Sequence, residues 1–157
     1  MFVKYLSIFF VSMVPLIELR GAIPMAVGME LNYWTALVIC MVGNMLPVPI
    51  IYFFARKVLI WGTNKKYIGK FFRFCLEKGE RGGQKLVRAA GRGGLFVALL
   101  LFVGIPLPGT GAWTGTLAAS FLNMGIKSTA LAVSLGVLLA GLIMGLASVG
   151  VFSVFGM

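Results

Sequence analysis

The feature that most constrains this chain is the length of its uncharged apolar runs. Residues 33–54 and residues 129–152 contain no charged side chain over 22 and 24 positions. A helix needs roughly 20 such residues to cross a hydrocarbon layer about 30 Å thick. Hydrophobic residues make up 60% of the sequence, more than the roughly half that soluble domains contain. The sequence therefore predicts an all-α integral membrane protein, with residues 1–157 forming one membrane domain.

The positive charge of the chain is concentrated in the polar segment between these two runs. The net charge is +10, and eleven of the fourteen basic residues lie between Arg56 and Arg92. Because loops rich in Lys and Arg stay on the inner side of a membrane, residues 56–92 are expected to be cytoplasmic. The protein is then integral to the cytoplasmic (inner) membrane of a prokaryote. A membrane-tethered loop is a poor candidate for nucleic-acid binding, so membrane lipids are the expected partners.

The same basic segment has the pattern of an amphipathic helix. Apolar residues including Tyr67, Phe71 and Phe72 recur at helical spacing, and Lys66, Lys70 and Arg73 lie mostly on the other side. Such a helix can lie on an anionic leaflet with its apolar face in the lipid.

Each half of the chain also contains an apolar segment that is broken near its middle. Residues 15–24 hold two prolines and a glycine, and no uninterrupted helix is expected there. Residues 106–111 form a second break, rich in proline and glycine. Arms of about 10 residues rise roughly 15 Å, half the hydrocarbon thickness. This favours two re-entrant hairpins. If both hairpins crossed fully, the protein would instead have about six spans.

The order of a broken hairpin followed by a full span occurs twice, in residues 1–55 and in residues 93–157. With residues 56–92 cytoplasmic, the first hairpin enters from outside and the second from inside. The result is an inverted-topology repeat, an architecture of transporters in which broken helices meet near the midplane. So short a chain has few spans, which favours a homodimer or larger homo-oligomer. Small residues from Gly136 to Gly145 are interpreted as a helix-packing face.

Charged and helix-breaking residues within the apolar segments are the candidate functional residues, because ionisable groups in a membrane are costly and tend to be functional. Arg20 offers a planar guanidinium to an anion such as phosphate, and a desolvated Glu18 could carry a proton. The alternative is an internal ion pair that pins the hairpin tip. Asn44, close to two prolines, either lines a cavity or marks a kink. The complete set of candidate substrate- and proton-binding residues is Glu18, Arg20, Gly21, Pro24, Asn44, Pro106, Pro108, Gly109, Thr110, Gly111, Trp113 and Thr114.

The second break has its own chemistry. Its glycines expose backbone N–H groups, and the arm that begins near Ala112 presents a helix N-terminus. Together these form a potential anion site, although a tight turn alone would explain the same residues. The sequence holds no His, no Asp and no CxxC motif, so it supplies almost no ligands for a transition metal. No cofactor is expected, and without a nucleophile motif an enzyme is disfavoured.

Two motifs resemble a known family. They are Glu18-Leu19-Arg20-Gly21-Ala22-Ile23-Pro24 and Gly104-Ile105-Pro106-Leu107-Pro108-Gly109-Thr110-Gly111-Ala112-Trp113-Thr114-Gly115, and they look like the small multidrug export protein family. That family is similar in outline to the DedA (VTT-domain) membrane proteins, which are associated with moving lipid-linked phosphates such as undecaprenyl phosphate. The resemblance implies that Glu18 and Arg20 are a functional pair in opposed re-entrant hairpins. The second break departs from the DedA pattern because it carries no arginine.

Three functions follow as hypotheses. The first is a proton-coupled transporter of an anionic lipid-linked phosphate, which requires Arg20. The second is a proton-coupled small multidrug exporter of hydrophobic cations, which requires Glu18 alone. The third is a non-transporting membrane scaffold, which requires neither charge.

Overall fold

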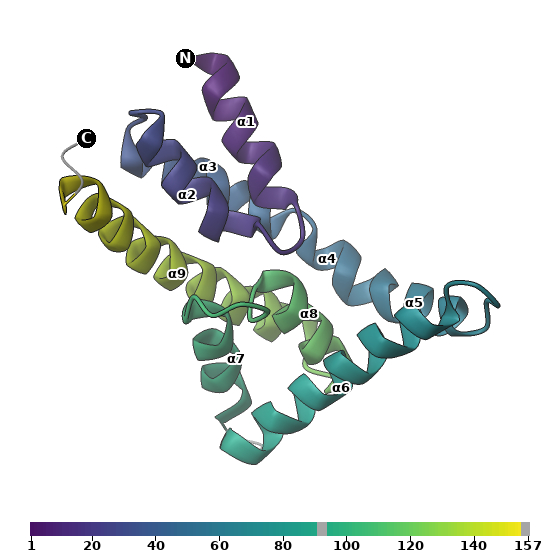
Figure 1. Cartoon of the computed structure of the whole chain (residues 1–157). Helices are drawn as coiled ribbons and strands as arrows, with labels where there is room; N and C mark the ends of the chain where they lie inside the picture. Colours follow the sequence, from purple (N-terminus) through teal and green to yellow (C-terminus); the bar gives the residue numbers. More distant parts are fainter. Residues whose placement is uncertain (91–93, 155–157) are drawn as a thin grey trace.

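The computed structural model of the chain describes residues 1–90 and 94–154 (Figure 1). In this part of the chain the secondary structure is helical, without strands. The predicted boundary between residues 92 and 93 lies outside the described residues. The helices are α1 (Phe2–Met13), α2 (Glu18–Gly28), α3 (Tyr33–Met45), α4 (Val48–Ile50), α5 (Arg56–Thr63), α6 (Gly69–Ala90), α7 (Leu95–Gly104), α8 (Ala112–Phe121) and α9 (Ile126–Val154), with a π-helix at Ile51–Ala55.

Two continuous apolar helices are long enough to cross a membrane, as predicted. They cover Tyr33–Phe54 and Ile126–Val151, with 22 and 26 residues. In each of them, 39% of the most apolar window is buried inside the protein. The rest of that apolar surface needs an apolar environment outside the protein, which a lipid bilayer supplies. The all-helical prediction is therefore confirmed for the described residues, and the two long apolar helices are consistent with a membrane protein.

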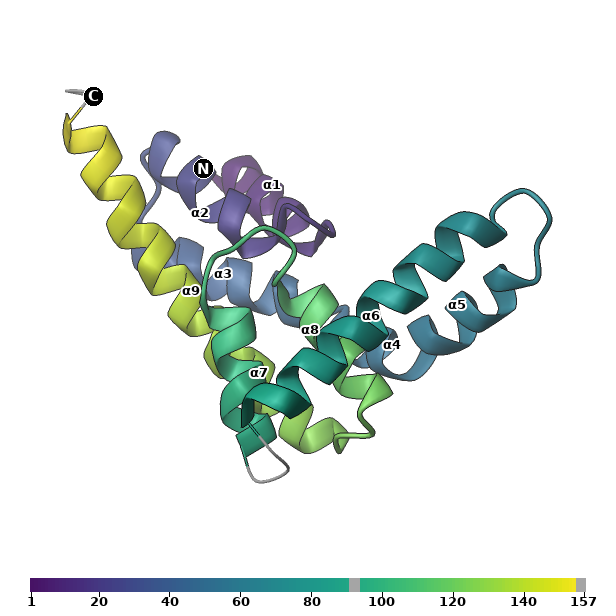
Figure 2. The same cartoon turned by 60° about the horizontal axis from the view of Figure 1, so that its bottom comes forward.

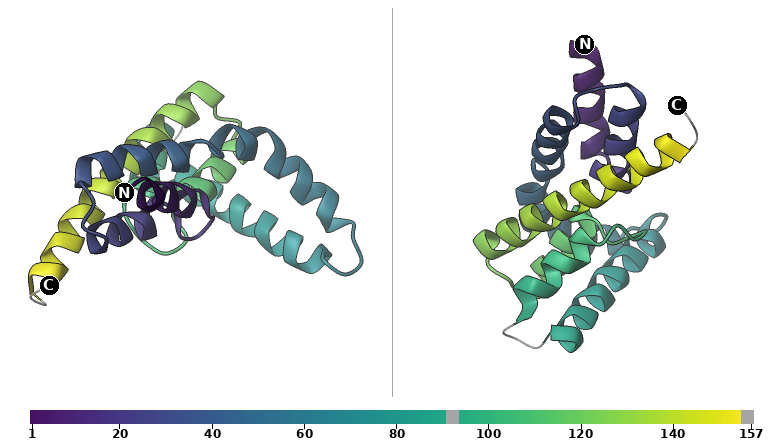
Figure 3. Two further views of the ribbon diagram at one scale, coloured as in Figure 1. Left: turned by 90° about the horizontal axis from the view of Figure 1, so that it is seen from above. Right: turned by 90° about the vertical axis from the view of Figure 1, so that its left-hand side faces the viewer.

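Two hairpins of half-length helices precede these spans. In the first, α1 and α2 have 12 and 11 residues, and in the second, α7 and α8 have 10 each. Helices of this length rise about 15–18 Å. Figure 1 shows the two hairpins approaching each other from opposite sides, so that their breaks meet near the centre of the molecule. Helix α9 packs against both α2 and α7, and the right view of Figure 3 shows it passing between the two hairpins.

The first break lies earlier in the chain than the sequence predicts. We expected residues 15–24 to lack an uninterrupted helix, but α2 begins at Glu18 and continues through Pro24 to Gly28. The chain turns instead at Leu16 and Glu18, whose φ values are 77° and 51°. Pro24 has no N–H to donate to the carbonyl of Arg20, a defect that costs about 3 kcal/mol in a helix. Tight packing outweighs this cost, because apolar residues on both sides of Pro24, such as Ile23 and Ala26, are almost fully buried.

The first span is irregular where Asn44 and the neighbouring prolines predicted a kink. Helix α3 ends at Met45, a short α4 follows, and the π-helix carries the chain into α5. Such irregularities arise where proline removes a helical hydrogen bond. The π-helix also contacts α8, because the Ser120 hydroxyl donates to the Tyr52 carbonyl over 3.0 Å.

The basic segment folds back on itself as a helical hairpin of α5 and α6. Figure 2 and the left view of Figure 3 show this hairpin extending away from the apolar bundle. Its inner part contacts α7 and α8 through α6, and its far end, residues 64–68, joins the two helices. The hairpin therefore separates most of the charge from the apolar helices.

Small residues allow the apolar helices to approach closely. A Cβ atom on Gly136 would lie 2.8 Å from the carbonyl oxygen of Leu100, and one on Gly141 would overlap Leu37. Both contacts lie on α9, where the sequence predicted a packing face. Gly43 has the same role between α1 and α3, since a Cβ there would overlap the Ser12 hydroxyl and lie 2.7 Å from the Phe9 carbonyl oxygen.

The substitution Gly43→Ala is expected to destabilise the protein by about 1–3 kcal/mol, because the added methyl meets the Phe9 backbone carbonyl as well as the Ser12 hydroxyl. The apparent melting temperature in detergent should fall by several degrees. Gly150→Ala is the matched control, because a Cβ at this helical position meets nothing within 4 Å. Equal melting temperatures for the two variants would contradict the close packing of α1 on α3.

Candidate substrate site at the meeting point of the two breaks

Glu18 lies at the first break and reaches the second. Its side chain is 4% exposed, and its carboxylate accepts hydrogen bonds from the backbone N–H groups of Ala112 over 3.1 Å and Trp113 over 3.2 Å. These two residues open α8, whose N-cap, Gly111, has no side chain to accept from them. The first N–H groups of a helix have no intrahelical partner and carry a partial positive charge. A carboxylate from the other half of the chain therefore caps α8.

Gly111 is what permits this contact. A Cβ atom at this position would overlap both oxygens of the Glu18 carboxylate. Its φ of −86° is ordinary for any residue, so the requirement for glycine comes from the close approach rather than from backbone conformation. The close approach of the carboxylate to the start of α8 therefore leaves no room for a side chain at position 111.

Arg20 makes the opposite contact at the end of α7. One terminal nitrogen of its guanidinium, Nη1, donates to the Leu107 carbonyl. The other, Nη2, donates to the carbonyls of Val103 over 3.1 Å and Thr110 over 2.6 Å. Further contacts of Nη2 reach the Ile105 carbonyl and the Thr110 hydroxyl. The last carbonyls of a helix lack partners and carry a partial negative charge, so the guanidinium caps α7.

Glu18 and Arg20 together form what we call the latch. The acid binds the positive end of α8 and the base binds the negative end of α7, so each charge meets a helix end of opposite sign. The alternative prediction of an internal ion pair is wrong for this conformation. Among the described residues, a salt bridge of 3.7 Å joins the exposed side chains of Glu77 and Arg81 on α6, and none joins Glu18 to Arg20.

The second break is shaped around the arginine. The Thr110 hydroxyl lies 3.0 Å from the Ile105 carbonyl oxygen and 2.9 Å from the Leu107 carbonyl oxygen, and these two acceptors share its one proton. Gly109 has a φ of 81°, a left-handed conformation that glycine adopts without strain. Pro106 and Pro108 lie in the same loop and supply no N–H groups that would compete for these carbonyls. The loop therefore presents several carbonyl oxygens to one guanidinium.

The structure brings most of the predicted site residues together, but not all of them. Thr110, Gly111 and Trp113 touch the latch directly, and Gly21 lies next to Arg20 in α2. The described hydrogen bonds do not connect Thr114, Pro24 or Asn44 to the latch. Sequence reasoning did not identify the carbonyls of Val103, Ile105 and Leu107, because a backbone acceptor leaves no mark in residue identity.

Polar side chains elsewhere in the bundle are buried without a hydrogen-bond partner within the described part of the chain. The atoms concerned are the Oδ1 of Asn44, the hydroxyls of Thr116 and Thr129, and the indole N–H of Trp113. Thr116 and Thr129 were not predicted, although polar residues in apolar helices are a usable signal. Among the described residues, no group of three or more His, Cys, Asp or Glu could hold a metal ion.

The family described as "Putative small multi-drug export protein" matches residues 18–143. This range covers most of the chain, which therefore belongs to that family, whose name denotes a membrane transporter. The match begins at Glu18, at the end of the first break, and includes the second break and both residues of the latch. No curated protein and no solved structure matches the chain.

The substitution Gly111→Ala is expected to displace the Glu18 carboxylate from α8 and to leave the two N–H groups uncapped. The loss should be about 1–3 kcal/mol, the cost of an unsatisfied buried polar group, and it should lower the apparent melting temperature. Gly125→Ala is the control, because a Cβ in that loop meets nothing within 4 Å. In a Glu18→Gln background, Gly111→Ala should cost less, and fully additive losses would contradict a direct contact.

Proposed function

We propose that this member of the small multi-drug export family transports an amphipathic substrate with an anionic headgroup, such as the lipid-linked phosphate undecaprenyl phosphate, and that this transport is coupled to a proton carried by Glu18. The observation that supports this proposal is the position of the Glu18 carboxylate. It occupies an anion site made by the N–H groups of Ala112 and Trp113 at the N-terminus of α8. Helix N-termini of this kind bind phosphate through the same groups.

The carboxylate and the substrate phosphate would compete for this site. The Glu18 carboxylate already accepts from both N–H groups, so the substrate headgroup would bind to them when Glu18 leaves. Protonation removes the negative charge that attracts Glu18 to the helix end, and the neutral acid is a weaker partner for the two N–H groups. Proton binding and phosphate binding therefore favour the same state of the protein, which couples them.

Arg20 would supply the second interaction with the substrate headgroup. In the latched conformation its terminal nitrogens donate to carbonyls of the second break. When the two breaks separate, the guanidinium loses these acceptors, and a phosphate at α8 becomes the nearest anionic replacement. A guanidinium binds phosphate through two parallel hydrogen bonds. Closed and open breaks would then be the two states of the transport cycle.

The same proposal includes the membrane topology. The half-length helices and the opposed approach of the two hairpins support re-entrant segments that meet near the midplane. The charge of the α5–α6 hairpin supports a cytoplasmic position for it. The loop at residues 122–125 would then face the cytoplasm, and the loop at residues 29–32 would face the opposite side.

A proton-coupled exporter of hydrophobic cations is the second candidate, favoured by the multi-drug description of the family. Glu18 is the acidic residue buried within the apolar bundle, and a cation could replace its proton. Two neighbours oppose this function, since Arg20 and the N-terminus of α8 both raise the positive potential at the site. A non-transporting scaffold would use neither charge.

The ligand preference can be measured as a thermal shift of the purified protein with undecaprenyl phosphate or a lipophilic cation at pH 6 and pH 8. Saturating phosphate ligand should raise the apparent melting temperature by roughly 5–10 °C, more strongly at pH 6, because the proposed binding of the phosphate is coupled to the uptake of a proton. Glu18→Gln, which resembles the protonated acid, should respond equally at both pH values. Arg20→Ala should lose most of the shift.

Glu30→Gln and Lys127→Ala are the controls for these two variants, because both residues are exposed and lie outside the latch. Stabilisation by the cation that disappears in Glu18→Gln would instead establish the multidrug exporter. A protein stabilised by neither ligand would support the scaffold.

The topology can be tested with single cysteines at Lys66, Gly125 and Leu107 in a variant without native cysteines. A membrane-impermeant maleimide should label positions 66 and 125 from the cytoplasmic side of inverted vesicles. Position 107 should resist labelling from either side, because a re-entrant break lies within the membrane. Labelling of position 107 from the outer face would show that α7 and α8 cross fully and that the six-span topology is correct.

A further inference from the structure

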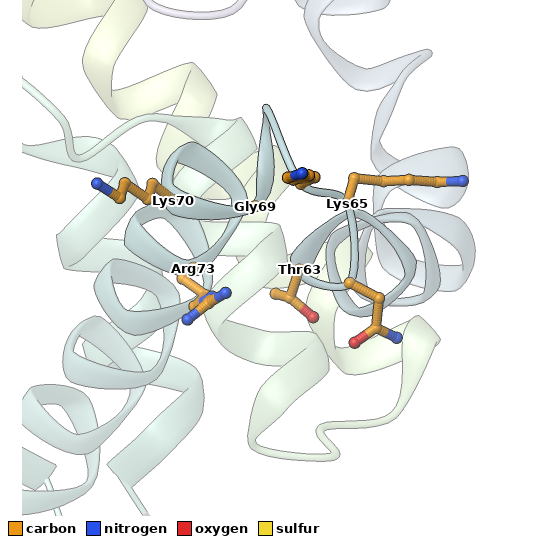
Figure 4. Close-up of a pocket in the computed structure, with 7 residues that line it drawn as sticks. Thr63, Lys65, Gly69, Lys70 and Arg73 are labelled. Carbon is orange, nitrogen blue, oxygen red and sulfur yellow. The ribbon is translucent and has the colours of Figure 1, made fainter.

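The far end of the α5–α6 hairpin contains a concentration of positive charge that has no part in the proposed binding of the transported substrate. A hollow of about 570 Å³ lies where α5 ends and α6 begins. Figure 4 shows Thr63 and Arg73 pointing to the same side of this hollow, while Lys65 and Lys70 extend outward in opposite directions. Lys66, Asn64 and Gly69 complete its lining. We call this feature the hairpin hollow.

Glycine and backbone hydrogen bonds build the hairpin hollow. A Cβ on Gly69 would lie 2.9 Å from the Thr63 carbonyl oxygen, and one on Gly62 would overlap the ring of Phe72. The N–H of Gly69 donates to the Lys65 carbonyl over 2.9 Å, and the Thr63 hydroxyl donates to the Ile60 carbonyl over 2.6 Å. The turn is therefore held in one conformation, with its cations placed around the gap.

The charges in this turn are not balanced by the protein. Four of the seven lining residues are cations and none is an acid. Among the described residues, the salt bridge between Glu77 and Arg81 involves none of these four cations. Helix α6 also begins here, and its 22 residues direct a positive helix end toward the same region. Like charges gathered in this way repel one another, and an anion bound between them would remove that cost.

Exposed aromatic residues next to the hollow indicate which kind of anion would bind there. Tyr67 is 93% exposed, Phe71 is 66% exposed and Trp61 is 59% exposed. Lys65 lies 4.5 Å from the centre of the Trp61 ring. Aromatic rings beside basic residues are typical of a surface that rests at a lipid interface, where the rings enter the headgroup layer. A soluble anion would give these rings no apolar partner.

We propose that the hairpin hollow binds the phosphate of an anionic phospholipid and so anchors the α5–α6 hairpin to the membrane surface. Arg73 would bind the phosphate oxygens, Lys66 and Lys70 would add charge, and the rings would contact the acyl-chain boundary. This site is built from elements other than those of the latch, and its ligand is a structural lipid rather than the transported substrate.

The test is lipid binding by native mass spectrometry of the full chain in a non-ionic detergent. The probes are short-chain phosphatidylglycerol, phosphatidylcholine of equal chain length, and inorganic phosphate. The wild-type chain should bind one phosphatidylglycerol at least about tenfold more tightly than phosphatidylcholine, since each basic residue near an anionic lipid contributes a several-fold gain. The variant Lys66→Gln/Lys70→Gln/Arg73→Gln should lose this preference.

The matched control is Lys57→Gln/Arg81→Gln/Arg88→Gln, which removes the same charge from exposed positions outside the hollow. Its affinity for phosphatidylglycerol should change less than threefold. Equal losses in the two triple variants would overturn the proposal in favour of diffuse charge attraction. Inorganic phosphate binding as tightly as the lipid would also overturn it. If the first triple variant does not fold, Arg73→Lys provides the test, because it keeps the charge but should weaken lipid binding severalfold.

Discussion

The structure depends on two charged side chains placed on the ends of two broken helices. Each break leaves helix ends inside an apolar bundle, where unpaired N–H and C=O groups are costly. The Glu18 carboxylate satisfies N–H groups at the start of α8, and the Arg20 guanidinium satisfies carbonyls at and beyond the end of α7. The first half of the chain thereby supplies the caps that the second half lacks. These two caps join the two hairpins at their breaks.

The same arrangement makes the junction suitable for movement. Hydrogen bonds to charged groups are strong when formed, at about 1.5–3 kcal/mol each. Under the proposed function a competing anion or a proton would replace them, and apolar packing offers no such replacement. The rest of the bundle has contacts of the other kind, with glycines of α9 set closely against α3 and α7. A rigid packed frame and an exchangeable polar junction therefore occupy different parts of one small molecule.

The α5–α6 hairpin is a third part of the molecule, distinct from the packed frame and from the polar junction. Its cations lie outside the apolar bundle, and its exposed rings favour a lipid surface over water. Charge in this protein is thus used in two ways. Within the bundle it appears as single residues, each matched to a helix end. Outside the bundle it is collected in one segment, where solvent reduces the cost of repulsion and the proposed lipid headgroup would reduce it further.

The sequence by itself indicated the helical class, the two long apolar helices, the two breaks and the isolated charges Glu18 and Arg20, because hydropathy, proline and isolated charge act locally. It misplaced the first break, since burial of residues such as Ile23 overrides the local effect of Pro24. It also offered an internal ion pair where the structure has two helix caps. The partners of Glu18 and Arg20 lie more than 80 residues away. They are largely backbone atoms, so only the tertiary structure could decide that each charge stabilises a helix end of the opposite half.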